Sequence, residues 1–276
     1  WESIVKRVKR PSDPPVRIAV VGKYTTLVDS YKSIQEALIH GGIAHDTGVE
    51  IDWLSSEAID VQGESFPDRY HGVLIPGGFG GRGVEGMVDT VRRIRQDDVP
   101  FFGICLGLQC AIIEFARNVC GLGGADSAEF SPTTPHPVIS LLDSQRQVTD
   151  KGGTMRLGAY PCVLQPNSNV LAIYDQPEIS ERHRHRFEVN NDYRERLAAE
   201  GLVFAGLSPD GGLVEIIELS DHPFFVATQF HPELKSRPTR PHPLFAAFIG
   251  AARDRRDRQS EGQVGSSAAL EPAELP

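Results

Sequence analysis

A cysteine flanked by two glycines is the strongest chemical signal in this sequence. Cys105 stands in "VPFFGICLGLQCAIIEF", two residues after Gly103 and two before Gly107. An apolar run typical of a buried strand precedes it, and a helical pattern follows. This is the pattern of a nucleophile on a sharp strand-to-helix turn, where the start of the helix favours the thiolate. The amide of Leu106 would then donate to an oxyanion in the same space. The alternative is a packed thiol, because free cysteine is often buried.

The segment "FFVATQFHPEL" supplies the base that a cysteine nucleophile requires. His231 and Glu233 stand two residues apart on an extended segment, so their side chains point the same way. The carboxylate would hold the imidazole tautomer and stabilise the imidazolium. With Cys105 they would form a Cys-His-Glu triad. Taken alone, the motif favours a solvated ion pair at the end of a strand.

A glycine-rich turn, "VLIPGGFGGRGVEG", contains a literal G-x-G-x-x-G at Gly78, Gly80 and Gly83. A dinucleotide site is not favoured, because that fingerprint belongs at the first strand–helix turn and this is the third. Pro76 also interrupts the junction with the strand. The interpretation we favour is that the amide of Gly78 is a second oxyanion donor. A flexible loop is the alternative.

The elements that must position these residues alternate along the chain. Strands are predicted at 16–22, 48–54, 70–78 and 99–104, with helices at 30–42 and 83–98 between them. This order indicates an open, mostly parallel α/β sheet flanked by helices, flavodoxin-like, with a small antiparallel extension. Later strand signals fall at 169–175, 202–219 (a hairpin over "SPDGG") and 224–230, and a closing helix at 242–256.

Residues 1–15 resemble an interdomain linker, 16–253 one domain, and 254–276 a disordered tail. The net charge of −9 argues against general nucleic-acid binding. The apolar runs are too short to span a membrane. Four cysteines without a C-x-x-C pair make a zinc site or a disulfide framework improbable and fit the cytoplasm. No metal site is expected.

Together, "PGGFG", "GICLGLQ" and "QFHPE" resemble the class I (triad-type) glutamine amidotransferases across nearly all of residues 16–253. Three further stretches, "VGKYTTLVDSYKSIQEAL", "GGTMRLGAYPC" and "ERHRHRFEVNN", resemble the glutaminase domains of the CTP synthase family. That family joins such a domain, through a linker, to a synthetase domain that this chain lacks.

The resemblance implies that Cys105 forms a γ-glutamyl thioester with glutamine, while His231 moves protons and Glu233 orients it. The amides of Gly78 and Leu106 would stabilise the oxyanion. It also implies a glutamine pocket that includes Gln109, Glu129 and Arg186. A carboxylate for the ammonium and a guanidinium for the carboxylate suit a zwitterionic substrate.

The resemblance further implies that ammonia passes to the synthetase domain, where UTP is aminated to CTP with ATP and Mg²⁺. No cofactor is expected in this domain. GTP would be an allosteric activator acting through a lid at 152–160, and a homotetramer is expected for the whole protein. Five residues are candidates for GTP contacts: Lys23, Lys32, Phe79, Arg156 and Arg184. One departure is Leu106, where the family often has an aromatic residue.

Three rival interpretations remain. The first is the glutaminase of guanylate, anthranilate or carbamoyl-phosphate synthesis, which would share the triad but lack "GGTMRLG" and "RHRHRFEVNN". The second is a γ-glutamyl peptidase that acts without a partner domain. The third is a regulatory module with a vestigial site, against which the intact triad argues.

Overall fold

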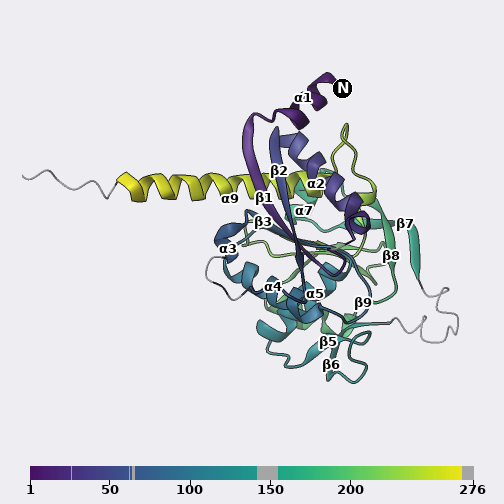
Figure 1. The fold of residues 1–276 in the computed structure, drawn as a ribbon. Helices are drawn as coiled ribbons and strands as arrows, with labels where there is room; N and C mark the ends of the chain where they lie inside the picture. Colours follow the sequence, from purple (N-terminus) through teal and green to yellow (C-terminus); the bar gives the residue numbers. More distant parts are fainter. Residues whose placement is uncertain (26, 62, 64–65, 142–154, 269–276) are drawn as a thin grey trace, which may run out of the picture.

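The computed structural model describes residues 1–25, 27–61, 63, 66–141 and 155–268 (Figure 1). Its main sheet has nine strands: β1 (Asp13–Gly22), β2 (Thr47–Ser55), β3 (Gly72–Ile75), β4 (Phe101–Ile104), β7 (Arg156–Leu164), β8 (Glu178–His185), β10 (Val203–Leu207), β11 (Val214–Glu218) and β12 (Phe225–Thr228). A small second sheet contains β5 (Ala125–Ser127), β6 (His136–Ser140) and β9 (Glu188–Val189). The helices are α1 (Glu2–Lys9), α2 (Lys32–His45), α3 (Phe66–Arg69), α4 (Val84–Gln96), α5 (Leu106–Asn118), α7 (Asn169–Tyr174), α8 (Arg194–Ala199) and α9 (Pro243–Ala268). Short 3₁₀ turns are η1 (Val28–Tyr31), η3 (Asn191–Tyr193) and η4 (Pro232–Leu234).

The order of the main sheet is β2-β1-β3-β4-β12-β11-β10-β7-β8. Strands β2, β1, β3, β4 and β12 run parallel, and the strands from β11 to β8 pair antiparallel. The predicted open α/β fold and the β10–β11 hairpin are confirmed. The antiparallel extension is larger than expected, because it supplies four of the nine strands.

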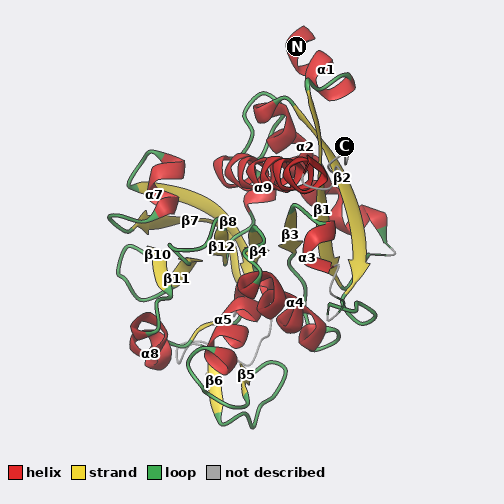
Figure 2. Cartoon of the chain, turned by 90° about the vertical axis from the view of Figure 1, so that its left-hand side faces the viewer, coloured by secondary structure: helices red, strands yellow, loops and turns green. Residues whose placement is uncertain are grey.

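Two hydrophobic cores lie on opposite faces of the sheet, as Figure 2 shows with α2 and α9 on one side and α4 and α5 on the other. Strand β1 contributes to both, because successive side chains point to opposite faces. Ile18 and Val20 pack in the core of α2 and α9, whereas Ala19 and Val21 pack in the core of α4 and α5. Each large side chain buried in this way contributes about 1.5–3 kcal/mol. No helix within the described ranges is long and apolar enough to cross a membrane.

The predicted strand at 169–175 is wrong, because this segment forms helix α7. The Ser168 hydroxyl accepts a hydrogen bond from the amide of Leu171 at 3.1 Å and caps the helix. The carboxylate of Glu218, from β11, accepts hydrogen bonds from the amides of Asn169 and Val170 at 2.8 and 3.0 Å. A capping partner 49 residues away satisfies the first turn, so the apolar run adopts a helix rather than a strand.

The predicted disordered tail is wrong for residues 254–268, which continue α9 away from the body of the molecule (Figure 1). Side chains near the start of this extension hold the helix to the domain. Arg255 donates to the carbonyl oxygens of Pro67 and Asp98 at 3.1 Å, and Arg256 donates to that of Pro14. Residues 269–276 lie outside the described part of the chain.

Two other boundaries differ from the prediction. The expected linker at 1–15 contains α1 and the first residues of β1. Helix α2 continues through Gly41 and Gly42, where the sequence predicted its end. A Cβ at Gly41 would lie 2.7 Å from the carbonyl oxygen of Phe245. These glycines therefore allow α2 to approach its neighbours closely, rather than ending the helix.

Candidate active site

The parallel strands β3, β4 and β12 end side by side and bring the three predicted motifs to one edge of the sheet. Ile75 at the end of β3 pairs with Gly103, and Thr228 at the end of β12 pairs with Ile104. The amide of Cys105 donates to the carbonyl of Thr228 at 2.6 Å. Ligands of open α/β sheets bind at this carboxyl edge.

Cys105 occupies a strained backbone conformation at the start of α5. Its φ of 53° and ψ of −97° are unusual for a residue with a side chain. A Cβ on Gly107 would collide with the carbonyl oxygen of Ile75, and one on Gly103 would lie 2.9 Å from the carbonyl carbon of Gly107. The strained turn expected from the sequence is therefore present, and both glycines are required by close packing around it.

His231 and Glu233 form a buried pair beside this turn. Nδ1 of His231 lies 2.7 Å from Oε1 of Glu233, and the amide of His231 donates to the carbonyl of Arg182 at 2.8 Å. Nε2 of His231 is buried and has no hydrogen-bond partner among the described residues. Burial disfavours the imidazolium, but interactions with Cys105 and Glu233 outweigh it and raise the pKa of His231 to about 10. Charge on this imidazole is therefore favoured at neutral pH.

The glycine-rich turn after β3 closes over Cys105. An ideal Cβ on Gly77 would lie 2.8 Å from Cε1 of His231 and 3.5 Å from Cβ of Cys105, so the turn contacts both. Nζ of Lys23 donates to the carbonyl oxygens of Phe79, at 3.2 Å, and of Gly80. The buried ammonium of Lys23 thus holds the glycine-rich turn in place through two of its carbonyl groups.

A cavity of about 230 Å³ opens beside Cys105, and it gathers most of the predicted glutamine-binding residues. Its lining contains Gly78, Phe79, Cys105, Gln109, Glu129, Met155, His185, Arg186 and Phe187. We call this cavity the glutamine pocket, after the prediction. The side chain of Leu106 is buried in the core and does not line the glutamine pocket. Leu106 could therefore act on a ligand only through its backbone amide.

The glutamine pocket contains two side chains of opposite charge, Glu129 and Arg186. Oε1 of Glu129 accepts a hydrogen bond from the amide of Gly80 at 3.0 Å, which fixes the carboxylate. Nε of Arg186 is buried and has no partner among the described residues. Nε2 of Gln109 donates to the carbonyl of Phe187 at 3.3 Å. A fixed carboxylate and an unsatisfied guanidinium in one cavity are suited to a zwitterionic ligand.

A buried polar cluster supports the wall of the glutamine pocket that carries His185 and Arg186. Arg156 pairs with Glu188 at 3.2 Å and with Glu215 at 2.8 Å. His183 Nδ1 lies 3.0 Å from His185 Nε2, so the two rings share a hydrogen bond. Burial, with Arg156 close by, lowers the pKa of His183 to about 2 and that of His185 to about 3. Both imidazoles are therefore neutral.

The five candidate GTP contacts separate into two groups. Phe79 and Arg184 line a second pocket of about 520 Å³, which adjoins Cys105 and His231, and the guanidinium carbon of Arg184 lies 5.9 Å from the Phe79 ring centre. Lys23 and Arg156 are engaged within the protein as described above. Lys32 lies on α2 in an exposed ion pair with Glu36. Of the predicted lid, residues 152–154 lie outside the described residues.

Sequence reasoning missed several residues around the site. It placed no role on His185 or Phe187, which line the glutamine pocket, or on the carboxylates of Glu188 and Glu215. Met155 also lines the pocket but was assigned only to the predicted lid. One signal for part of this set was present in "ERHRHRFEVN". The histidines there alternate with arginines, as expected of a strand with one buried face.

Comparison with known proteins identifies the family. The family model of class-I glutamine amidotransferases matches residues 26–251. The chain belongs to the class I glutamine amidotransferases. This amidotransferase is 57% identical over 253 residues to a CTP synthase of Carboxydothermus hydrogenoformans, covering 91% of this chain and 47% of the relative. It is 54% identical over 264 residues to a CTP synthase of Syntrophus aciditrophicus, covering 95% of this chain and 49% of the relative.

A solved structure agrees with this assignment. The glutaminase domain of Trypanosoma brucei CTPS, with bound acivicin, matches this amidotransferase with a TM-score of 0.79 at 36% identity. The match covers 87% of this chain and 94% of that one. The predicted family is therefore confirmed. The chain spans about half the length of the curated relatives it matches.

Proposed function

We propose that this domain hydrolyses glutamine to glutamate and ammonia through a thioester on Cys105. The observation that carries the proposal is that two features meet at the strained, buried Cys105: the His231–Glu233 pair on one side, and on the other a pocket with the opposite charges of Glu129 and Arg186. The pocket volume of about 230 Å³ suits a ligand of amino-acid size. Glu129 would accept hydrogen bonds from the α-ammonium, and Arg186 would donate to the α-carboxylate.

The chemistry follows from the protonation state of the pair. His231 takes the proton of the Cys105 thiol, the sulfur attacks the side-chain carbonyl carbon of glutamine, and the amides of Gly78 and Leu106 donate to the oxyanion that forms. His231, held as an imidazolium by Glu233, gives its proton to the departing nitrogen, which leaves as ammonia. The neutral imidazole then removes a proton from water, which attacks the thioester and releases glutamate and the thiol.

We propose further that the ammonia is used by a synthetase domain to aminate UTP to CTP. Support comes from the CTP synthases that this chain resembles, which are about twice its length. In this proposal ATP, UTP and Mg²⁺ bind to the synthetase domain, and no residue of this chain is assigned to them. The whole protein would be a homotetramer.

GTP activation is proposed to act at the pocket of about 520 Å³ beside Cys105. Phe79 is 47% exposed and offers a ring on which a purine base would stack. Arg184, next to that ring, would contact the guanine or the phosphates. Lys23 and Arg156 would act by holding the walls of the site, since their charged groups are engaged in the protein. Lys32 would contact the nucleotide only after leaving Glu36.

Covalent labelling tests the glutaminase proposal. The chain is treated with 6-diazo-5-oxo-norleucine, a glutamine-like electrophile, with and without excess glutamine, and is then mapped by mass spectrometry. A single adduct on Cys105 that glutamine blocks is the expected result. Cys110, whose thiol pKa burial raises to about 12, serves as an internal control and stays unlabelled.

A matched variant separates substrate binding from reactivity. Arg186→Met is expected to lose protection by glutamine while Cys105 still reacts with iodoacetamide. Labelling of Cys105 that glutamine does not affect in the native chain would argue against a glutamine site. Absence of labelling with the folded chain, both alone and with the synthetase domain and nucleotides added, would contradict the proposed nucleophile.

A further inference from the structure

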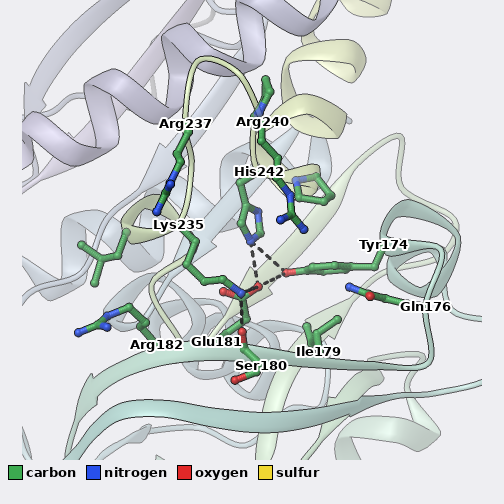
Figure 3. Close-up of a pocket in the computed structure, with 13 residues that line it drawn as sticks. Tyr174, Gln176, Ile179, Ser180, Glu181, Arg182, Lys235, Arg237, Arg240 and His242 are labelled. Atoms are coloured by element: carbon green, nitrogen blue, oxygen red, sulfur yellow. Dashed lines mark hydrogen bonds and ion pairs between the residues drawn. The ribbon is translucent and has the colours of Figure 1, made fainter.

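A third concave site is lined in part by the segment that directly follows Glu233, and it shares no residue with the glutamine pocket. It is a cavity of about 480 Å³ between the end of α7, strand β8 and the segment 234–243. Figure 3 shows its side chains. Leu234 alone also lines the pocket assigned to GTP. The volume is in the range of small-molecule sites. We call it the basic pocket.

Four exposed cations line the basic pocket against a single carboxylate. The cations are Arg182 on β8 and Lys235, Arg237 and Arg240 on the segment after η4, and the carboxylate is Glu181. In the described part of the chain, no carboxylate pairs with any of the three arginines, whereas Lys235 pairs with Glu181 at 3.3 Å. A net positive charge therefore gathers in a hollow, where it attracts anions more strongly than on a flat surface.

Glu181, at the floor of the pocket, has one oxygen satisfied and one not. Oε1 lies 3.3 Å from the Tyr174 hydroxyl and 3.1 Å from Nε2 of His242, and these contacts converge on it in Figure 3. The amide of Leu244 donates to Nδ1 of His242, which leaves Nε2–H to donate to Glu181. Oε2 is buried, since Glu181 is only 1% exposed, and it has no hydrogen-bond partner among the described residues. A buried acceptor without a donor is costly, so this oxygen is suited to a donor from a ligand.

The basic pocket is joined to the candidate catalytic turn through the backbone. The carbonyl of Arg182 accepts the hydrogen bond from the amide of His231, at 2.8 Å. Lys235 follows η4, which contains Glu233, and its Nζ donates to the carbonyl of Ser180 on β8. A ligand that binds Arg182 and Lys235 would therefore restrain both segments that position the imidazole of His231, namely β8 and the segment around η4.

We propose that the basic pocket binds a phosphate ester that also carries free hydroxyls, such as a sugar phosphate or a nucleotide. The guanidinium groups of Arg182, Arg237 and Arg240 take the phosphate, for which their planar donor geometry is suited. Oε2 of Glu181 accepts a hydrogen bond from a sugar hydroxyl, as acidic residues do for ribose in nucleotide sites. An inorganic anion would satisfy the arginines but would leave Oε2 of Glu181 without a donor.

Titration calorimetry at low salt tests the proposal with three probes: ribose 5-phosphate, methyl phosphate and inorganic phosphate. Ribose 5-phosphate is expected to bind one site per chain, more tightly than either other probe. The double variant R237A/R240A is expected to weaken ribose 5-phosphate at least about tenfold, from the loss of charge-assisted hydrogen bonds. R258A is the control, because it removes one exposed arginine on α9 away from the pocket, and it is expected to change affinity less than about twofold.

The variant E181Q tests the second contact. It is expected to weaken ribose 5-phosphate while leaving methyl phosphate unchanged. Should E181Q fail to fold, the comparison of ribose 5-phosphate with methyl phosphate on the native chain answers the same question. Absence of saturable ribose 5-phosphate binding at millimolar concentration would overturn the proposal. So would equal affinity in R237A/R240A and R258A, or equal affinity of the native chain for the two esters.

Discussion

The two walls of the glutamine pocket are held by different forces. The wall that carries Cys105 is formed by the ends of β3, β4 and β12, where backbones approach so closely that Gly103 and Gly107 have no room for a side chain. The opposite wall, with His185 and Arg186, rests on the buried charges around Arg156. Cys105 is thus placed by shape, whereas His185 and Arg186 are placed by electrostatics. The first wall should tolerate changes of pH, and the second should not.

Replacing Cys105, the proposed nucleophile, gives the largest expected effect and should spare the fold. Cys105→Ala and Cys105→Gly should both abolish glutamine hydrolysis, because no sulfur remains to form the thioester. They should differ in stability. Glycine adopts a φ of 53° without strain. The free energy of unfolding of Cys105→Gly should therefore be about 1 kcal/mol higher than that of Cys105→Ala.

Glutaminase assays and urea unfolding of both variants measure these effects. Equal stability of the two variants would mean that the first wall stores no strain at Cys105.

Breaking the buried ion pairs should damage the second wall most. Arg156→Met leaves Glu188 and Glu215 buried without their cation, which should cost about 3–5 kcal/mol of the free energy of unfolding where both carboxylates are charged. The loss should be smaller at pH 6 than at pH 9, because burial raises the pKa of both carboxyl groups, that of Glu188 to about 8, and protonation removes the uncompensated charge as the pH falls. Urea unfolding at pH 6 and 9 measures both values. The triple variant R156M/E188Q/E215Q should recover most of the loss, and a triple variant as unstable as R156M would show that charge is not the cause.

Crowding the first wall should cost less and should not depend on pH. Gly107→Ala places a Cβ against the carbonyl oxygen of Ile75 and is expected to destabilise the domain by about 1–3 kcal/mol. Gly123→Ala is the matched control, because no atom would lie within 4 Å of its Cβ. Urea unfolding of both variants at pH 6 and 9 gives the comparison, and a pH-dependent loss in Gly107→Ala would break the distinction between the walls.

Glu188 gives the smallest and most specific test. Burial raises its pKa to about 8, so the stability that it contributes is fully present below pH 4.5 and is lost as the pH rises through about 8. Glu188→Gln lacks this group, so its free energy of unfolding relative to the native chain should increase between pH 5 and pH 9. Glu178→Gln, at an exposed position of β8, should show no such trend in the same measurements.

The same difference explains what could be predicted from the sequence. Backbone crowding leaves glycines at fixed spacing, so the turn at Cys105 and the parallel sheet could be inferred. The partners of Arg156 could not, because Glu188 and Glu215 meet it only after β7, β9 and β11 assemble, and a buried glutamate looks like an exposed one in sequence. Helix α7 was missed for a similar reason, since its cap includes Glu218 from β11. Nor did the sequence indicate that Lys23, a candidate GTP contact, donates to carbonyl oxygens of the glycine-rich turn.

The hydrogen bond from His231 to Arg182 also has a consequence for solubility. Strand β8 is the outer strand of the main sheet, and an unpaired outer strand can recruit another chain into an intermolecular sheet. The amide of His231 and the ammonium of Lys235 occupy two of its carbonyl oxygens, while Arg182 and Arg184 place charge along it. The segment that would carry out proton transfer thus also shields the domain from aggregation. Substitutions that loosen the segment with His231 and Lys235 should therefore make the chain precipitate and should also lower its turnover of glutamine.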